Sequence, residues 1–223
     1  DVEIVGDAQD IVPALVNAMA SKAPAIASRE DELNGVKADV HAMLEDKLAP
    51  QMSWIKVLRE ALDDDGIYVD ELTQVGYVSR VAMPIYHPRT FLTSGFQGTL
   101  GSGLATAIGA KIAHPDKQVL SINGDGGFMY NVQELATAVK YNVALVAIVF
   151  ADGAYGNVRR MQQNLYDNRT IASDLTNPDF VALAESFGCA AYRAETPEQL
   201  AKTLPEAFKQ TVPTVIEVPF PPT

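Results

Sequence analysis

Two short loops rich in aspartate and glycine carry the residue types best suited to chemistry in this chain. Residues 124–128 read Gly-Asp-Gly-Gly-Phe, and residues 151–157 read Ala-Asp-Gly-Ala-Tyr-Gly-Asn. Each loop follows an apolar run and places one acid, Asp125 or Asp152, beside glycines. Carboxylates and free backbone N–H groups together are what a divalent cation carrying a phosphate group needs. The two loops therefore predict a cation–phosphate site.

Each residue type in these loops has a possible role in such a site. Gly126 and Gly127 let a phosphate approach the backbone closely, because they have no Cβ. Asp125 repels a bare phosphate, so its place here makes sense if a cation lies between them. Mg²⁺ prefers six oxygen ligands, and Asp152 and the carbonyl of Ala154 could supply two more of them. The alternative, that both acids only form turns before glycine, stays open.

The elements around these loops predict where they lie. The apolar runs 118–123 and 144–150 read as strands, and a helical pattern separates them. Strands joined in this way are parallel, so both loops should lie at the same edge of the sheet, where ligands bind in open α/β sheets. The alternation of strands and helices elsewhere predicts an α/β three-layer sandwich, with a mostly parallel central sheet flanked by helices.

The remaining elements follow from periodicity and punctuation. Residues 1–7 read as a strand, and Ile11, Leu15, Val16 and Met19 form a short helical stripe. Further helices are expected near 36–48 and from 51 onwards. Asn177 is a candidate N-cap, with Pro178 at the first helical position. Additional strands are expected at 67–69, 90–93, 190–193 and 214–218.

Composition and charge narrow the class of protein. Nearly half of the 223 residues are hydrophobic, which is enough for a sizeable core, and the net charge is −11. That charge argues against a nucleic acid or a membrane surface as partner, since both attract basic faces. The single cysteine, Cys189, cannot form an internal disulfide and suits a reducing compartment. With no signal peptide recognised, we expect a cytoplasmic protein.

The two loops resemble the metal and diphosphate motif of thiamine-diphosphate-dependent enzymes. Asp152 follows Asp125 by 27 positions, which matches the spacing in that family. The resemblance covers about residues 51 to 219, and it is to the diphosphate-binding domain of the acetolactate synthase, pyruvate oxidase and 2-oxo acid decarboxylase group. Four further segments carry it: Gly-Thr-Leu-Gly at 98–101, Ala-Ile-Gly-Ala at 107–110, Glu-Leu-Ala-Thr-Ala at 134–138 and Asn-Pro-Asp-Phe at 177–180.

The resemblance implies a cofactor and a set of binding residues. Asp125 and Asp152 would bind Mg²⁺ through their side chains, and Ala154 through its carbonyl. The carbonyl of Gly98 would accept a hydrogen bond from the aminopyrimidine of thiamine diphosphate, and Leu100 would keep the cofactor bent. The implied cofactor-binding residues are Gly98, Thr99, Leu100, Gly124, Gly126, Gly127, Phe128, Ala154, Tyr155 and Gly156.

The resemblance also implies a function and a domain plan. The activity would be that of a thiamine-diphosphate- and Mg²⁺-dependent transferase or lyase, similar to acetolactate synthase, which makes or breaks C–C bonds next to the carbonyl of 2-oxo acids. Residues 1–20 would be the tail of a preceding central domain, 21–50 a linker with a helix, and 51–223 the diphosphate- and Mg²⁺-binding domain.

The activating Glu of the family belongs to a pyrimidine-binding domain, and these residues contain no such domain. No catalytic residue is therefore expected in this chain. We expect the missing domain to come from another chain or from an N-terminal part, within a homo- or hetero-oligomer. The isolated chain should then be inactive.

Two features leave alternatives open. The metal loop of the family is usually Asn-Asn, whereas this chain has Ala151 and Asp152, so a carboxylate replaces an amide. Arg159 or Arg160 could pair with a substrate carboxylate or an acyl carrier, but solvent exposure explains them equally well. The alternative functions are a non-catalytic cofactor-binding or assembly module of the same fold and a Mg²⁺-dependent phosphate-transfer enzyme.

Overall fold

The computed structural model describes residues 3–22 and 27–220 of the chain. Its internal contacts divide it into two units, Asp1–Ala42 and Met43–Thr223. The domain boundaries expected from the sequence, at residues 20 and 50, stay predictions. Within the described residues, no helix is both long and apolar enough to cross a membrane.

The N-terminal unit contains one whole helix and the start of a second. Helix α1, Ala8–Met19, contains the predicted helical stripe, and Asp7 caps it by accepting a hydrogen bond of 2.7 Å from the backbone N–H of Gln9. The strand predicted over residues 1–7 is wrong for residues 3–7, which form no strand, while residues 1–2 lie outside the described part. Helix α1 buries no side chain.

Helix α2, Glu30–Ala61, consists of two arms that meet at Leu48, which has non-helical dihedral angles of φ −132° and ψ 28°. Pro50 explains the break, because its ring clashes with the carbonyl four residues earlier and it has no N–H to donate. The second arm belongs to the sheet-containing unit, where Met52, Trp54 and Leu58 are buried in an apolar core. The helices predicted near 36–48 and from 51 onwards are these two arms.

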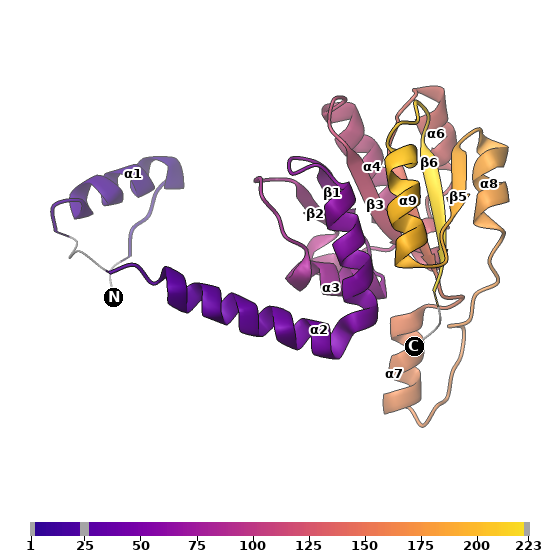
Figure 1. The fold of residues 1–223 in the computed structure, drawn as a ribbon, viewed down its shortest axis with the longest axis horizontal. Coiled ribbons are helices and arrows are strands. Elements are labelled where there is room, and N and C mark those ends of the chain that lie inside the picture. The colour runs from indigo at the N-terminus through magenta and orange to yellow at the C-terminus, as the bar shows by residue number, and fades with distance from the viewer. Residues whose placement is uncertain (1–2, 23–26, 221–223) are drawn as a thin grey trace. The chain divides into compact units, whose positions relative to one another are not determined.

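A six-stranded sheet forms the centre of the second unit, and every pair of neighbouring strands is parallel (Figure 1). The strand order is β2-β1-β3-β4-β6-β5. The sheet confirms the predicted α/β class and each strand expected in this unit. The strands are β1 Ile67–Asp70, β2 Phe91–Thr93, β3 Val119–Gly124, β4 Val146–Ala151, β5 Ala190–Arg193 and β6 Thr214–Pro219.

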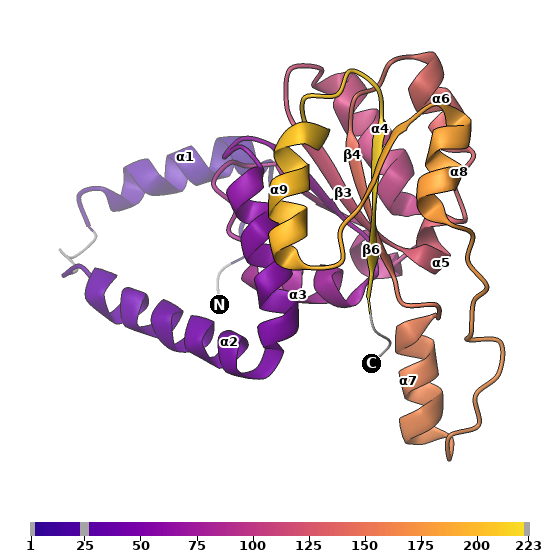
Figure 2. The same ribbon diagram turned by 45° about the vertical axis from the view of Figure 1, so that its right-hand side comes forward.

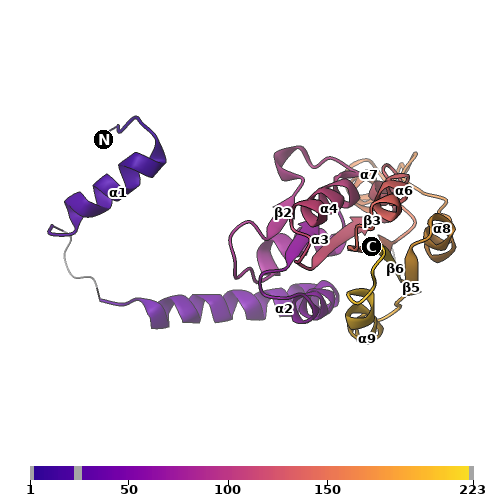
Figure 3. The ribbon, with the colours of Figure 1, turned by 90° about the horizontal axis from the view of Figure 1, so that it is seen from above.

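Helices cover both faces of this sheet, as a three-layer sandwich requires. Side chains alternate along β3, so that Leu120 and Ile122 belong to one apolar core and Val119 belongs to the other. Helix α9 lies over one face (Figure 2), and α4 and α6 lie on the opposite face (Figure 3). The first core joins the second arm of α2 with α3 Gln74–Ala82 and α9 Pro197–Ala207; the other joins α4 Ser102–Ala113, α6 Glu134–Lys140 and α8 Phe180–Phe187.

The strand order places a crevice between the carboxyl ends of β1 and β3. From β1 the chain crosses to β2 on one side, and it then returns to β3 on the other side and continues away from it. A reversal of this kind leaves an open crevice, which is the usual ligand site in open α/β sheets. The residues that leave β1 and β3 there are the candidates for function.

Candidate functional site

The two Asp-Gly loops meet at the carboxyl edge of the sheet, as predicted. Strands β3 and β4 are neighbours, and Gly124 is in register with Phe150. Asp125 is buried, and its Oδ1 accepts a hydrogen bond of 2.8 Å from the N–H of Gly126. Its Oδ2 accepts another, also 2.8 Å, from the N–H of Gly153 in the second loop. The Asp125 carboxylate therefore joins the two loops directly.

Asn177 belongs to this site, although the sequence suggested a different role. Its Nδ2 donates a hydrogen bond of 2.6 Å to Oδ2 of Asp125. The prediction that Asn177 caps the following helix is wrong, because the N-cap of α8 is Asp179, which accepts a 3.0 Å bond from the N–H of Ala182. Asn177 and Asp179 are both residue types that cap helices. Asp179 caps α8, and Asn177 donates its hydrogen bond to Asp125 instead.

Asp152 is half-buried beside Asp125, and its Oδ1 accepts a 3.2 Å hydrogen bond from the N–H of Ala154. Burial, followed by the negative charge of Asp125, raises the pKa of Asp152 above its ordinary value. A buried and a half-buried carboxylate that repel one another form a site at which a divalent cation would be stabilising.

Ala154 is oriented so that its carbonyl can join the two carboxylates. It forms an antiparallel bridge with Asp174, in which Tyr155 donates to Ser173 and Leu175 donates to Gly153, each bond 2.8 Å long. The N–H of Ala154 points away from that bridge, towards Asp152. The N–H and C=O of an extended residue point to the same side, so the carbonyl of Ala154 faces the acids too.

The donors present fit Mg²⁺ better than a metal that needs many side-chain ligands. No group of three or more His, Cys, Asp and Glu side chains able to hold a metal occurs among residues 3–22 and 27–220. Mg²⁺ is commonly held by one or two carboxylates, with the rest of its octahedron completed by water and by phosphate oxygens of a ligand. Two acids and one carbonyl match that pattern.

A cavity of about 530 Å³ lies at the crevice and collects most of the predicted site residues. Its volume falls within the usual range for small-molecule sites, ~300–1,000 Å³. Thr99 and Phe128 do not line it, and the Phe128 ring instead packs in the core against Phe180, with ring centres 5.9 Å apart. The predicted residues that line the cavity are Gly98, Leu100, Gly124, Asp125, Gly126, Gly127, Asp152, Ala154, Tyr155 and Gly156.

The glycines of the first loop, Gly126 and Gly127, stand where no side chain of their own would fit. Helix α5, Asp125–Phe128, begins directly at the end of β3. The N–H groups of its first turn have no backbone partner within the helix, although that of Gly126 donates to Oδ1 of Asp125. A Cβ at Gly126 would lie 2.5 Å from the Tyr155 ring, and one at Gly127 would lie 1.8 Å from Oε1 of Glu71. The missing side chains therefore let Tyr155 and Glu71 pack directly against this loop. Both glycines also line the cavity, where a diphosphate could meet their backbone.

One side of the cavity, supplied by the residues after β1 and by α3, was not predicted from the sequence. Leu72, Thr73, Gln74 and Tyr77 line it, and Thr73 caps α3 by accepting a 2.9 Å bond from the N–H of Gly76. The Oε1 of Gln74 accepts a hydrogen bond of 3.2 Å from Nε2 of Gln51, which also lines the cavity. The sequence signal for this wall was the pair of acids, Asp70 and Glu71, directly after the apolar run 67–69. Asp125 was predicted as a site residue from the same pattern.

Glu71 is the second of those acids, and it is fully buried. Its Oε1 accepts a hydrogen bond of 2.8 Å from the N–H of Gly101, and its Oε2 accepts one of 2.9 Å from the N–H of Gly103. Burial raises the pKa of Glu71 above its ordinary value, and the two backbone hydrogen bonds oppose that rise.

The two candidate arginines differ in position. Arg160 lines the cavity, where its Nη2 donates a 2.9 Å hydrogen bond to Oδ1 of Asn157. Arg159 pairs with Asp174 instead, with Nη1 and Oδ1 3.2 Å apart, and it does not line the cavity. Arg160 is thus the one placed to meet a ligand carboxylate.

Comparison with known proteins gives a consistent result. Residues 73–218 match the family described as "Thiamine pyrophosphate enzyme, C-terminal TPP binding domain". A probable acetolactate synthase large subunit from Methanococcus aeolicus is 33% identical over 245 aligned positions, covering 100% of this chain and 40% of that protein. An acetolactate synthase from Bacillus subtilis is 35% identical over 232 positions, covering 98% of this chain and 39% of that protein.

A solved structure shows the same fold. The thiamine diphosphate-dependent 4-hydroxybenzoylformate decarboxylase of Rhodococcus jostii RHA1 superposes with a TM-score of 0.71 and 32% identity, over 77% of this chain and 32% of that one. The chain thus spans about 40% of the length of the curated relatives it matches.

Proposed function

Because the chain belongs to the thiamine pyrophosphate enzyme family and carries its C-terminal TPP-binding domain, we propose that it supplies the diphosphate- and Mg²⁺-binding side of the active site in an acetolactate synthase-like enzyme. One observation carries the proposal. Asp125 and Asp152 lie at the carboxyl ends of neighbouring parallel strands and line the same cavity as Gly98 and Leu100.

Each residue of the cavity has a distinct task in this proposal. Asp125, Asp152 and the carbonyl of Ala154 hold Mg²⁺, which offsets the charge of the two acids and of the diphosphate. The N–H groups at the start of α5 donate to the diphosphate. Gly98 accepts a hydrogen bond from the aminopyrimidine through its carbonyl, and Leu100 packs against the cofactor. When bound, thiamine diphosphate supplies the group that stabilises a carbanion.

The proposed substrate is a 2-oxo acid, and the proposed reaction makes or breaks the C–C bond next to its carbonyl, with decarboxylation. The relatives described as acetolactate synthases and the structural neighbour described as a decarboxylase support this class of chemistry. Arg160 would orient the substrate carboxylate through a charge-assisted hydrogen bond.

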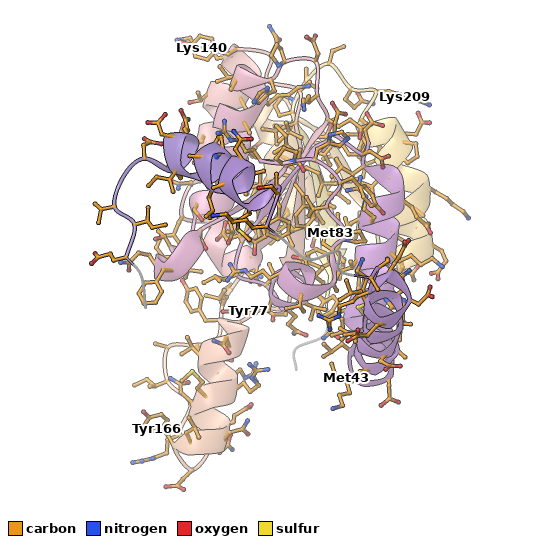
Figure 4. The ribbon with its side chains drawn as sticks, turned by 90° about the vertical axis from the view of Figure 1, so that its left-hand side faces the viewer. Met43, Tyr77, Met83, Lys140, Tyr166 and Lys209 are labelled. Carbon is orange, nitrogen blue, oxygen red and sulfur yellow. The ribbon has the colours of Figure 1, made fainter. Side chains whose placement is uncertain are left out.

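We propose that a pyrimidine-binding domain, from another chain or from an N-terminal part of the same protein, covers this cavity and brings the activating Glu. Helix α7, Gly156–Leu165, follows the metal loop and projects beyond the ends of the strands, with Tyr166 just beyond its outer end and at the opposite end of the unit from Lys140 (Figure 4). It buries no side chain, although Val158, Met161 and Leu165 form an apolar stripe. An uncovered stripe beside the cavity supports a further domain in a homo- or hetero-oligomer. Activity would then require that domain.

A reducing compartment suits the single cysteine. Cys189 is buried and unpaired, and burial raises the pKa of its thiol to about 11, so the thiolate that forms disulfides is scarce at neutral pH. We therefore propose a cytoplasmic location.

Calorimetric titration of the protein with thiamine diphosphate tests the proposed function. We expect binding that depends on Mg²⁺ and is lost with a chelator, because two acids cannot accept a diphosphate without a cation. Asp125→Ala should abolish it, since this variant removes a cation ligand and the link between the loops. Equal heats with and without Mg²⁺, or none with either, would refute the proposal and favour the non-catalytic assembly module.

A further inference from the structure

Glu71 has contacts that its position in the sequence does not suggest. It directly follows β1, where its own N–H donates to the carbonyl of Ile122 in β3, at 3.1 Å. Its side chain is fully buried and forms no ion pair with a Lys, Arg or His of residues 3–22 and 27–220. A buried carboxylate without a counter-ion costs free energy, so it persists only where hydrogen bonds stabilise it.

Those hydrogen bonds come from the start of α4. Gly101 is the N-cap residue and offers no side chain to cap the helix, so the first N–H groups of α4 need an acceptor from elsewhere. Glu71 accepts from the N–H of Gly101 with Oε1 and from that of Gly103 with Oε2, at 2.8 and 2.9 Å. A carboxylate at the positive end of a helix dipole is also favourable electrostatically. Glu71, the residue after β1, therefore caps α4 from a distant part of the sequence.

The same carboxyl group touches the diphosphate loop. A Cβ at Gly127 would come within 1.8 Å of Oε1, and a Cβ at Gly103 would come within 2.7 Å of Oε2. Both glycines thus leave the space that the Glu71 side chain fills. On the far side of the turn, Nδ2 of Asn131 donates a 2.7 Å hydrogen bond to the carbonyl of Gly101. Gly101 is held through its N–H by Glu71 and through its carbonyl by the segment that follows α5.

Two helix N-termini approach the cavity, and Glu71 distinguishes between them. The start of α4 is satisfied by Glu71, so it is not available to an anion. The start of α5 lies on the other side of the same carboxyl group, and there the N–H of Gly126 donates to Oδ1 of Asp125 instead. The side chain of Glu71 therefore lies between the turn that contains Gly98 and Leu100 and the loop 124–128.

We propose that Glu71 is a positioning residue of the cofactor site: its carboxyl group fixes the spacing between turn 98–103 and loop 124–128, so that one molecule of thiamine diphosphate can contact both. This inference rests on the proposed function. Loss of either hydrogen bond frees the turn to move, which lowers the fraction of molecules competent to bind and weakens the apparent affinity by that fraction.

The test compares Glu71→Gln with Asp70→Asn by calorimetric titration with thiamine diphosphate and Mg²⁺. Glu71→Gln keeps the size but turns one acceptor into a donor facing an N–H. Asp70 is the matched control, because it is the neighbouring buried acid and its carboxylate pairs with the guanidinium of Arg80, with Oδ2 and Nε 2.6 Å apart. At a temperature at which all variants are folded, we expect the Kd to rise at least tenfold in Glu71→Gln and less than threefold in Asp70→Asn.

Amide hydrogen exchange without cofactor gives a second readout. Exchange at Gly101 and Gly103 should accelerate at least tenfold in Glu71→Gln and stay unchanged in Asp70→Asn. If Glu71→Gln does not fold, the wild-type rates decide: protection of these two amides supports the inference, and exchange as fast as in the first turn of the uncapped α7 overturns it.

The outcomes separate the two proposals. No cofactor binding by the wild type would refute the proposed function, while the exchange measurement would still test the hydrogen bonds of Glu71. Binding by the wild type with an equal Kd in Glu71→Gln, or an equal loss in Asp70→Asn, would overturn the positioning role alone.

Discussion

Replacing Gly127 with alanine should destabilise the protein far more than a Gly-to-Ala change normally does. The new Cβ would lie 1.8 Å from Oε1 of Glu71, whereas ordinary contacts begin at 3.4 Å. The end of a flexible side chain usually moves aside at little cost. Glu71 cannot do so, because it is fully buried and both of its oxygens accept hydrogen bonds from α4.

The magnitude follows from what must move. Relief of the overlap takes Oε1 roughly 1.5 Å or more from its position, which breaks the 2.8 Å bond from the N–H of Gly101. A lost hydrogen bond to a charged group costs about 1.5–3 kcal/mol, and overpacking costs about 1–3 kcal/mol. Alanine returns up to about 1 kcal/mol through its higher helix propensity. The expected loss in the free energy of unfolding is roughly 2–5 kcal/mol.

Denaturant unfolding measures this loss, and Gly109→Ala is the matched control. Gly109 is exposed within α4 and has no atom within 4 Å of its would-be Cβ, so alanine there should stabilise by about 0.5–1 kcal/mol. Adding Glu71→Ala to Gly127→Ala removes the overlap, so the two losses should sum to more than the loss in the double variant. Unfolding of Gly127→Ala within about 0.5 kcal/mol of the wild type, or strict additivity, would contradict the reasoning.

Three further predictions concern single side chains. Burial and Asp125 raise the pKa of Asp152, so protons should compete with Mg²⁺ at a higher pH than for an ordinary Asp; Mg²⁺ affinity followed on lowering the pH should fall earlier in the wild type than in Asp152→Asn. In the enzyme completed by the pyrimidine-binding domain, Arg160→Gln should raise the KM for a 2-oxo acid about tenfold, the worth of one charge-assisted hydrogen bond. Arg159→Gln, outside the cavity, should change that KM less than about twofold. Cys189 has a pKa of about 11 against 9.0 for an ordinary thiol, so the unfolded chain loses this proton first and the free energy of unfolding should fall as the pH rises from about 9 to 11; an identical pH slope in Cys189→Ala would contradict this.

Much of the fold could be predicted because the parallel sheet is buried on both faces. Each strand of such a sheet reads as a short apolar run bounded by turn residues, and the runs at 118–123 and 144–150 became β3 and β4 within two residues. The sequence could not show that the two helical patterns on either side of Leu48 are arms of one element. Nor could it exclude a strand over residues 1–7, where the pattern was apolar but nothing pairs with residues 3–7.

The site was predictable where chemistry and spacing coincide. Asp125 and Asp152 each follow an apolar run, so their meeting at one edge of the sheet follows from parallel strands alone. Asn177 was assigned to the wrong partner because a cap is a local role, whereas its hydrogen bond to Asp125 spans 52 residues. Local rules cannot find a contact at that separation.

The role of Glu71 is difficult to predict from the sequence, and its contacts in the structure explain it. An acid after a strand normally points to solvent, and a glycine-rich stretch normally suggests a flexible loop. Here the acid and the glycines explain each other, since Gly103 and Gly127 lack side chains where Glu71 needs room, and Gly101 donates its N–H to it. The glycines of turn 98–103 and loop 124–128 therefore do more than admit a ligand to the backbone. They also admit the buried carboxyl group that fixes one loop against the other, so a change at any of them should be felt in both.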